Sequence, residues 1–385
     1  MKILILNDGS EYENWGIQAC IDGIKYILGN NTIDSVKHSN LHQKYSFEPE
    51  LFGKKIFNNE SRITKRFFQE YLKTPNVVDE LDYFCDLWER GEGGPGSRDI
   101  IDAISASDIV AFNAEGSTYR KNIGAFRSLF LLYLAKKKFG KKAFFVNGSV
   151  TLNEVDATLP AYIDKIFHSI DGVCVREPKS AKSLQNFTSF RNFSVIPDSV
   201  FALDLQNSEV DLNQQFCFSL SMLPMQRYPV NNTNPMVNLV NRASVKFGKC
   251  KFLAKDVEDQ YLKELANHTK SAFLGHNLNY TEIERELAKS KCLISGRYHH
   301  LIFALRVGCP VIPLKSSSHK IDGLMEFYEG LLPSPFDPTS LRTETTKILD
   351  YLDNFNDIAL RKKIRKRSEE LRLRALNLRT ELVKC

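Results

Sequence analysis

Short apolar runs that alternate with helix-like patterns constrain the fold of this chain more than any other feature. Residues 3–6 (Ile-Leu-Ile-Leu) form the first run, and residues 15–28 follow with apolar side chains at helical spacing. Such runs are typical of parallel strands, because crossover helices cover both faces of the sheet. The chain is therefore predicted to be an α/β protein. Further expected strands and helices lie at residues 108–113, 126–139, 142–147, 171–176 and 193–198.

The alternation runs through the chain twice, which predicts two domains. A second series begins at Phe216 and continues to Leu314, and 385 residues exceed the size of one ordinary core. We expect two tandem Rossmann-like, doubly wound domains with a ligand cleft between them, at the carboxyl ends of the strands. Their predicted ranges are 1–205 and 216–345, with a polar linker between them and a basic helical segment at 346–385.

Residues 39–99 interrupt the alternation of the first domain. They are rich in Phe, Tyr, Lys and Glu and end in a glycine-rich stretch at 90–97. This pattern predicts an insertion. The insertion could be a surface excursion or a lid that covers an acceptor substrate.

The charge of the chain is concentrated at its C-terminal end. The net charge is +6, yet residues 359–385 alone carry ten Lys or Arg and three Glu, a net of +7. The remainder is therefore close to neutral, which disfavours a nucleic-acid partner. The basic segment also has leucines near one helical face, so we expect it either to pack on the domains or to contact an anionic inner membrane surface.

The cysteines and the hydropathy indicate a cytoplasmic protein. The eight cysteines are scattered and form no CxxC pair, as expected for reduced core residues. No apolar run approaches the roughly 20 residues of a membrane span. The first apolar run is also too brief for a signal peptide.

The segment 295–305 is the strongest candidate for a functional site. Arg297, His299 and His300 stand at an expected helix start, directly after Gly296. The first turn of a helix has unpaired N–H groups and the positive end of the helix dipole. With an arginine beside it, this segment predicts a site for a phosphate or a carboxylate.

A second polar segment follows the next expected strand, at residues 310–314. Ser316, Ser317 and Lys320 offer hydroxyls and a further positive charge for the same anion. An ordinary polar loop is the alternative.

Polar side chains also follow the first strand of the N-terminal domain. Asn14 and Gln18 offer donors at a helix start, and Gly16 lets the backbone approach a ligand. These three residues are candidates for contact with an acceptor. The alternative is an ordinary helix with Asn14 as its cap.

Glu115 lies where the strand that begins near residue 108 ends, followed by Gly116 and Ser117. A carboxylate at this place could accept a proton from a sugar hydroxyl, and Gly116 and Ser117 suit a phosphate or sugar contact. A solvated turn carboxylate is the alternative.

Two more charged residues close expected strands. Arg176 follows an apolar strand with Ser180 four residues on, which fits anion binding or an ion pair. Asp198 is expected to cap a turn or orient a neighbour.

The sequence shows no metal or nucleotide motif. No Asp/His cluster has metal-ligand spacing, and GxGxxG and GxxxxGK[ST] are both absent. We therefore expect no metal and no cofactor, with Arg, Lys and His neutralising a leaving phosphate instead.

Taken together, these motifs resemble the polysaccharide pyruvyl transferase family, whose fold is similar to that of GT-B glycosyltransferases. Those enzymes move the enolpyruvyl unit of phosphoenolpyruvate onto a sugar and form a ketal. The resemblance covers roughly residues 1–330. The matching elements are N-x-G-x-Q at 14–18, Arg176 with Ser180, a DPxF-like element at 198–201 with Ser in place of Pro, R-x-H-x-L-I-F-A-L-x-x-G-x-P-V-I at 297–312, and S-x-x-x-K-x-x-G at 316–323.

The resemblance implies a transferase of polysaccharide biosynthesis that acts on a capsule or exopolysaccharide, or on a lipid-linked precursor, with phosphoenolpyruvate as donor. It implies that Arg297, His299, Arg176 and Lys320 hold the donor and that His299 moves a proton. His300, Ser316 and Ser317 would complete the donor site.

One departure from the family pattern keeps a second function open. The family has a glycine triplet where this chain has Ala114-Glu115-Gly116. An acidic residue there, with serines at 316–318, is similar to transferases of the same fold that use CMP-linked sialic acid or Kdo. In that interpretation Glu115 is the base of a glycosyltransferase. A non-catalytic glycan-binding descendant is a third hypothesis.

Overall fold

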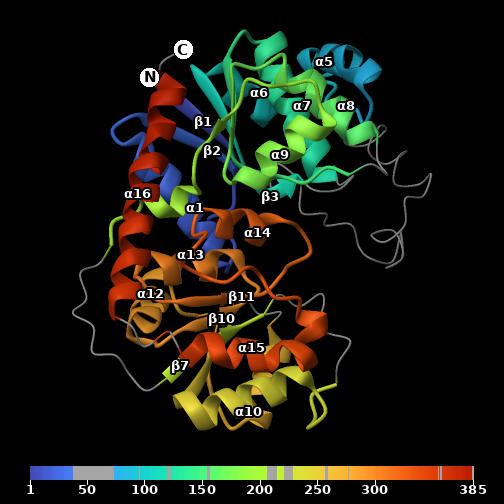
Figure 1. Ribbon diagram of the computed structural model, residues 1–385. Helices are drawn as coiled ribbons and strands as arrows, with labels where there is room; N and C mark the ends of the chain where they lie inside the picture. The colour runs from blue at the N-terminus through green and yellow to red at the C-terminus, as the bar shows by residue number, and fades with distance from the viewer. Residues whose placement is uncertain are drawn as a thin grey trace. The chain divides into compact units, whose positions relative to one another are not determined.

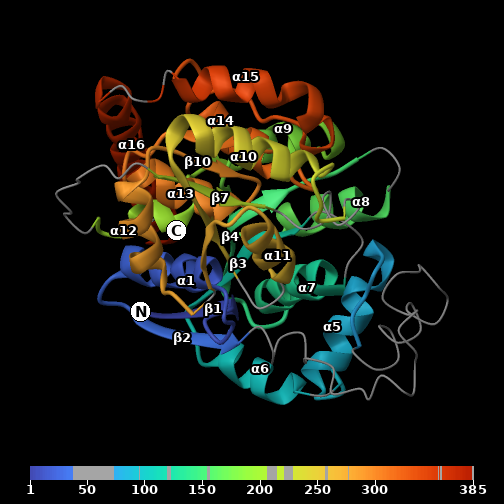
Figure 2. The same ribbon diagram turned by 90° about the horizontal axis from the view of Figure 1, so that it is seen from below.

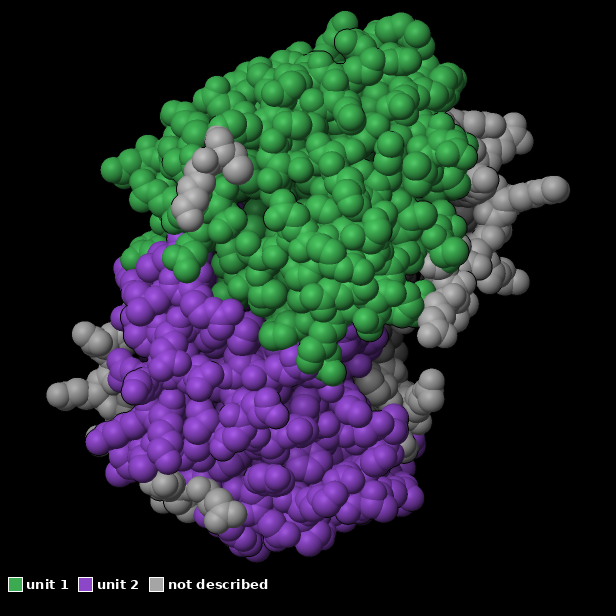
Figure 3. All heavy atoms as spheres, turned by 45° about the horizontal axis from the view of Figure 1, so that its top comes forward, with its two compact units in different colours: residues 1–11, 25–197, 377–385 green, residues 12–24, 198–376 purple. Residues whose placement is uncertain are grey.

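Each of two units of the chain is built around one parallel sheet (Figure 1). Unit 1 comprises residues 1–11, 25–197 and 377–385, and unit 2 comprises residues 12–24 and 198–376 (Figure 3). The division falls inside two helices, α1 (Trp15–Leu28) and α16 (Ile358–Val383). The computed structural model describes residues 1–37, 73–94, 96–118, 123–153, 157–205, 215–220, 229–255, 259–275, 277–353, 355 and 358–383.

The sheet of unit 1 has the strand order β2-β1-β3-β4-β5-β6, with all neighbours parallel. The chain adds β2 on one side of β1 and then builds β3 to β6 on the other side. The order therefore reverses between β1 and β3, and doubly wound sheets bind ligands at the carboxyl ends of such a strand pair. The strands are β1 (Lys2–Asp8), β2 (Thr32–Lys37), β3 (Ile109–Thr118), β4 (Lys142–Val150), β5 (Gly172–Val175) and β6 (Ser194–Val195).

The core of unit 1 confirms the apolar pattern of the sequence. Leu4 and Leu6 of β1 and Phe112 of β3 belong to one buried cluster, together with side chains of the covering helices. Ile3 and Ile5, on the opposite side of the pleat, are also fully buried. The strands are therefore covered on both faces. The helices are α5 (Leu81–Glu89), α6 (Ser97–Ser105), α7 (Ile123–Lys137), α8 (Thr158–Phe167) and α9 (Pro178–Phe187).

The expected insertion at 39–99 is only partly described. Residues 38–72 lie outside the described residues, and so does the expected linker at 206–214. The remaining part begins with a short 3-10 helix, η2 (Val78–Glu80), and continues into α5. Leu81 and Trp88 of α5 belong to the buried cluster of unit 1. This part is therefore core structure, because its apolar face packs on the unit instead of facing solvent.

The sheet of unit 2 has the strand order β11-β10-β7-β8-β9, again all parallel. Here the order reverses between β7 and β10. The helices α10 and α15 lie side by side and share one buried cluster with the sheet (Figures 1 and 2). The strands are β7 (Gln215–Ser219), β8 (Lys249–Leu253), β9 (Ala272–Leu274), β10 (Leu293–Ser295) and β11 (Val311–Pro313). The helices are α10 (Pro235–Phe247), α11 (Gln260–His268), α12 (Tyr280–Lys289), α13 (Tyr298–Arg306), α14 (Lys320–Glu326) and α15 (Leu341–Asp353).

The expected C-terminal helix is α16, and its apolar stripe is buried in the protein. Ile364 and Leu371 are almost fully buried, while the basic side chains of Lys362, Lys363 and Lys366 are exposed. Within unit 2, the guanidinium of Arg361 donates to the carbonyl oxygens of Ala288 and Ser290 at 2.9 and 3.0 Å. The leucine pattern of the sequence therefore marks a packing face. No described helix is long and apolar enough to cross a bilayer.

The described cysteines are all free thiols in the buried interior. Burial raises the pKa of Cys174 and of Cys217 to about 12, so neither thiol ionises at neutral pH.

Two glycines test how tightly α13 packs on α16. Gly308 lies two residues after the end of α13 with φ +74°, and a Cβ there would lie 2.7 Å from the carbonyl oxygen of Arg361. Gly330 has φ +78° and open space around it. We expect Gly330→Ala to lower the free energy of unfolding by about 1 kcal/mol, from backbone strain alone. Gly308→Ala should cost at least about 1 kcal/mol more, because the helix must shift. Urea denaturation measures both, and equal losses would contradict the close approach.

Candidate active-site residues

In unit 2, Arg297 lies at the start of α13, directly after the carboxyl end of β10. The amide of Gly296 donates to the carbonyl oxygen of Ser219 at 3.1 Å, and the amide of Arg297 donates to Oγ of Ser295 at 2.9 Å. These bonds fix the turn from strand to helix. The first N–H groups of α13 are thus held at the edge where the strand order reverses, as the sequence predicts for an anion site.

The guanidinium of Arg297 is held by two acceptors. Its Nε donates to the carbonyl oxygen of Leu220, and its Nη2 pairs with the buried carboxylate of Asp259. That carboxylate also accepts from the amide of Lys255 at 2.6 Å. Among the described residues, none accepts a hydrogen bond from Nη1. Arg297 is therefore oriented by the protein, and one of its amino groups is available to an anion.

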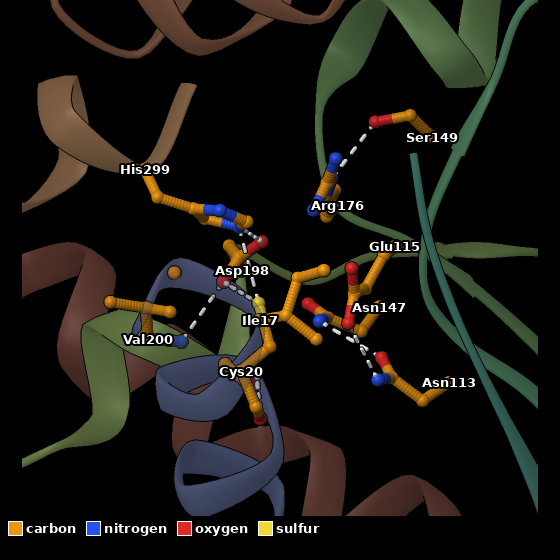
Figure 4. A network of polar contacts seen from close by, with 12 residues as sticks. Ile17, Cys20, Asn113, Glu115, Asn147, Ser149, Arg176, Asp198, Val200 and His299 are labelled. Atoms are coloured by element: carbon orange, nitrogen blue, oxygen red, sulfur yellow. Dashed lines mark hydrogen bonds and ion pairs between the residues drawn. The ribbon is translucent and has the colours of Figure 1, made fainter. Parts of the chain in front are cut away.

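His299 lies against α1, where Gly16 makes room for its ring. A Cβ at residue 16 would lie 2.5 Å from Nδ1 of His299. The other ring nitrogen, Nε2, is 3.2 Å from Sγ of Cys20 and 3.9 Å from Oδ2 of Asp198 (Figure 4). Residues 16 and 20 are one helical turn apart on the same face of α1. Gly16 therefore serves the packing of His299.

Asp198 caps a short 3-10 helix, η3 (Ser199–Ala202), as the sequence predicts. Its Oδ1 accepts from the amide of Val200 at 3.0 Å, and the side chain is fully buried. Sequence reasoning did not find Cys20, because an apolar position on a helix face gives no signal for a polar contact. Cys20 becomes notable only when α1 and α13 are placed together.

His300 is a core residue. Its ring is fully buried and packs edge-on against Trp15, with ring centroids 4.4 Å apart. Burial, and then the charges of Arg297 and Lys255, lower the pKa of His300 well below its usual value, so the ring is neutral. His299 and His300 are consecutive in α13, and consecutive helical residues point about 100° apart, so the two rings face different directions. The expected donor contact of His300 is therefore not supported by its position.

The second polar segment of unit 2 follows β11. The amide of Leu314 donates to the carbonyl oxygen of Ser295 at 2.7 Å, so this loop starts beside the end of β10. Ser316 donates to the carbonyl oxygen of Ser318 at 3.0 Å, Ser317 is exposed, and half-buried Lys320 begins α14. The structure thus places these residues at the same edge of the sheet as Arg297.

The two amides at the start of α1 make local hydrogen bonds. Oδ1 of Asn14 accepts from the amide of Gly16 at 3.1 Å, and Nε2 of Gln18 donates to the carbonyl oxygen of Tyr12 at 2.8 Å. Asn14 is therefore a helix cap, the alternative that the sequence left open.

In unit 1, three residues at the ends of neighbouring strands have left-handed backbones. Asn7 (φ 68°), Glu115 (φ 43°) and Asn147 (φ 55°) lie within the last four residues of β1, β3 and β4. Nδ2 of Asn113 donates to Oε1 of Glu115 at 3.2 Å, and Nδ2 of Asn147 donates to Oδ1 of Asn113 at 3.2 Å (Figure 4). Strained backbones of this kind cluster at functional sites. For Gly116 and Ser117 the structure describes only the backbone, which continues β3.

Arg176 is half of a buried ion pair. Its side chain is 1% exposed, its Nε donates to Oγ of Ser149 at 2.8 Å, and it lies 3.6 Å from Oε2 of Glu177. Ser180 accepts from the amide of Val150 at 2.7 Å. The charge of Arg176 is thus compensated within the unit, which sequence spacing could not reveal.

Asp8 is a buried carboxylate at the end of β1 that sequence reasoning missed. It lies 3.0 Å from Nζ of Lys37 and 3.6 Å from Nζ of Lys25, and the amide of Ser10 donates to it at 2.9 Å. Burial by itself would raise the pKa of Asp8. The hydrogen bonds from Ser10 and Lys37 outweigh burial and hold the pKa well below its ordinary value.

Three solved structures with a similar architecture match nearly the whole chain. They are S. aureus MnaA with UDP (11% identity, covering 100% of this chain and 98% of that one, TM-score 0.52), Arabidopsis thaliana UGT89C1 complexed with quercetin (9%, 99% and 99%, 0.54) and a putative UDP-N-acetylglucosamine 2-epimerase from Listeria monocytogenes (14%, 98% and 94%, 0.52). The chain spans only 55% and 53% of the length of two S. aureus TarM structures that it also matches. Among curated proteins, none matches the sequence significantly.

These likenesses show the fold alone: the chain is an α/β protein with the GT-B fold of glycosyltransferases and epimerases. The sequence identifies the family within this fold. The family model of polysaccharide pyruvyl transferases matches residues 18–318, so the chain belongs to the polysaccharide pyruvyl transferase family.

The buried carboxylate of Asp8 in unit 1 makes the stability of the protein depend on pH. Because its pKa is lower in the folded protein than the ordinary value of about 3.9, the unfolded chain binds the proton more tightly. The stability that Asp8 contributes is therefore complete above about pH 5 and is lost progressively as the pH falls from about 3.9 toward the lower pKa of the folded protein. We expect Asp8→Asn to lower the free energy of unfolding by about 2 kcal/mol at pH 7 and by less at pH 3, where part of the contribution of Asp8 is already lost.

Asp34→Asn is the matched control, since Asp34 is half exposed and pairs with Lys2 at 3.5 Å. It should cost about 0.5 kcal/mol or less. Urea denaturation at pH 3 and pH 7 makes the comparison. A loss for Asp8→Asn that does not depend on pH would contradict the lowered pKa.

Proposed function

We propose that the protein transfers the enolpyruvyl unit of phosphoenolpyruvate onto a sugar of a cell-surface polysaccharide, such as a capsule or exopolysaccharide, or of its lipid-linked precursor. The observation that carries the proposal is Arg297. It is held by Asp259 and Leu220 at the start of α13, in a chain of the polysaccharide pyruvyl transferase family.

Phosphoenolpyruvate carries a carboxylate and a phosphate, which suit this edge of unit 2. Nη1 of Arg297 and the first N–H groups of α13 can bind one anion. Lys320, with Ser316 and Ser317, offers a second positive charge and hydroxyls after the neighbouring strand. The resemblance also implies Arg176, but its guanidinium would have to leave Glu177 to reach a ligand. We therefore assign the donor to the residues of unit 2.

The proposed reaction adds two sugar hydroxyl oxygens to C2 of the enolpyruvyl unit. Two C–O bonds form, the bond from C2 to the phosphate oxygen breaks, and C3 becomes a methyl group. Of the two hydroxyl protons, one ends on C3 and the other leaves with phosphate. We assign proton transfer to His299 and activation of a hydroxyl to Glu115. The cations that bind the donor stabilise the departing phosphate, so the proposal requires no metal and no cofactor.

The proposed partner is a glycan or a lipid-linked sugar, with no role for nucleic acid. We propose a cytoplasmic location, where such precursors are assembled. Contact with the inner membrane would then involve the exposed basic side chains of α16, because its apolar stripe is buried.

A ligand screen tests the donor. We expect millimolar phosphoenolpyruvate to raise the melting temperature, and CMP, UDP and GDP to have little effect. Arg297→Ala should weaken phosphoenolpyruvate binding at least about tenfold, because the oriented guanidinium is lost. Arg242→Ala, which removes an exposed arginine of α10, is the control and should bind normally. A shift with a nucleotide and none with phosphoenolpyruvate would overturn the proposal.

The geometry of Glu115 supports the second candidate function, a GT-B glycosyltransferase with a nucleotide-activated donor such as CMP-linked sialic acid or Kdo. The amides that orient this carboxylate would equally suit a base acting on an acceptor hydroxyl. The donor screen separates the two functions, since only the second requires nucleotide binding. A non-catalytic glycan-binding protein is the third candidate, and repeated turnover with any donor would exclude it.

Glu115→Gln tests the base in either transferase. The amide cannot accept the proton, so we expect kcat to fall about 10²–10³-fold while the melting shift caused by the donor is unchanged. Glu92→Gln, at an exposed position of the same unit, is the control. Full activity of Glu115→Gln would remove Glu115 from the mechanism.

A further inference from the structure

Three side chains from distant parts of the sequence converge beside α13. They are Cys20 of α1, Asp198 at the cap of η3 and His299 of α13, and all three belong to unit 2 (Figure 4). Sγ of Cys20 is 3.2 Å from Nε2 of His299 and 3.7 Å from Oδ1 of Asp198. Nε2 of His299 is 3.9 Å from Oδ2 of Asp198. One ligand atom from each of the three residues therefore lies within 4.8 Å of the others.

The spacing of these atoms is close to that of the ligands in a tetrahedral zinc site. Zinc binds cysteine sulfur at about 2.3 Å and histidine nitrogen or carboxylate oxygen at about 2.0–2.2 Å. Tetrahedral angles then place two ligand atoms about 3.3–3.7 Å apart. The contacts of 3.2 Å between Cys20 and His299, 3.7 Å from Cys20 to Oδ1 of Asp198 and 3.9 Å from His299 to Oδ2 are close to that range, so a small rotation of the Asp198 carboxylate would bring one oxygen to both partners. Three protein ligands also leave the fourth position open.

The chemistry of the three side chains and their surroundings also favours zinc. A thiolate and an imidazole suit zinc, and one carboxylate with one thiolate would neutralise its charge. The carboxylate of Asp198 is fully buried and oriented by the amide of Val200. The ring of His299 is held against Gly16 and remains 14% exposed. The ligands are thus positioned from outside the cluster, as in metal sites with a supporting shell of hydrogen bonds.

We propose that Cys20, Asp198 and His299 form a binding site for one Zn²⁺ and that the bound ion inhibits the transferase. On binding, the thiol of Cys20 gives its proton to solvent, and the sulfur and Nε2 of His299 each share a lone pair with the metal. His299 then cannot carry a proton through that nitrogen. The inhibition rests on the function proposed above, whereas the binding does not.

Metal binding is measured first, on the full chain after removal of metal by chelation. Equilibrium dialysis against ZnCl₂ should show about one Zn²⁺ per chain, and CoCl₂ should produce the near-ultraviolet absorption of a cobalt thiolate. Cys20→Ser should weaken Zn²⁺ binding at least tenfold and abolish that absorption. His268→Ala, which removes an exposed imidazole of α11, is the control and should retain both.

Activity is measured second, with and without Zn²⁺. We expect Zn²⁺ to lower turnover of the unaltered protein, and to lower the turnover of Cys20→Ser by a much smaller factor, each relative to its own zinc-free rate. Zinc binding that Cys20→Ser leaves unchanged would overturn the site and leave the cluster as hydrogen-bonded support for His299. Zinc inhibition of Cys20→Ser equal to that of the unaltered protein would overturn the regulatory role. A failed pyruvyl transfer assay would leave the dialysis result standing, so the two proposals can fail separately.

Discussion

Burial of parallel strands on both faces is the constraint on which the rest of this structure depends. Side chains such as Ile3, Leu4 and Phe112 must be apolar because helices cover both sides of the sheet. Polar side chains can then gather only where strands end. In unit 1 the carboxyl ends of β1, β3 and β4 carry Asp8, Glu115 and Asn147, and in unit 2 the segment after β10 carries Arg297. The chemistry of the protein is located at these edges because the sheets admit it nowhere else.

The pairing of buried charges decides which arginine can bind a ligand. Arg297 keeps part of its side chain accessible, and Asp259 orients it without occupying Nη1. Arg176 is almost completely buried, and Glu177 and Ser149 hold its Nε. Removing a buried charge from such a pair costs several kcal/mol. The first arrangement prepares a guanidinium for an anion, and the second stabilises the junction of β4 and β5.

Much of this could be predicted from the sequence, because it depends on local order. The apolar runs predicted both sheets, and the turn from Ser295 to Arg297 predicted the helix start, since each is written in consecutive residues. Contacts between distant segments could not be predicted. Cys20 next to His299, Glu177 compensating Arg176 and His300 packed on Trp15 all depend on how helices and strands are placed together. The positions of these residues in the sequence do not determine how far apart they lie in the folded protein.

The left-handed backbone of Glu115 gives this carboxylate a conformational cost that a glycine at the same position would avoid. With φ 43°, this residue adopts a conformation that glycine reaches freely and that other residues reach at a cost of about 1–2 kcal/mol. The hydrogen bond from Asn113 offsets part of that cost. The strand end is thus held in a bend that costs conformational free energy, and that bend sets the position of the carboxylate.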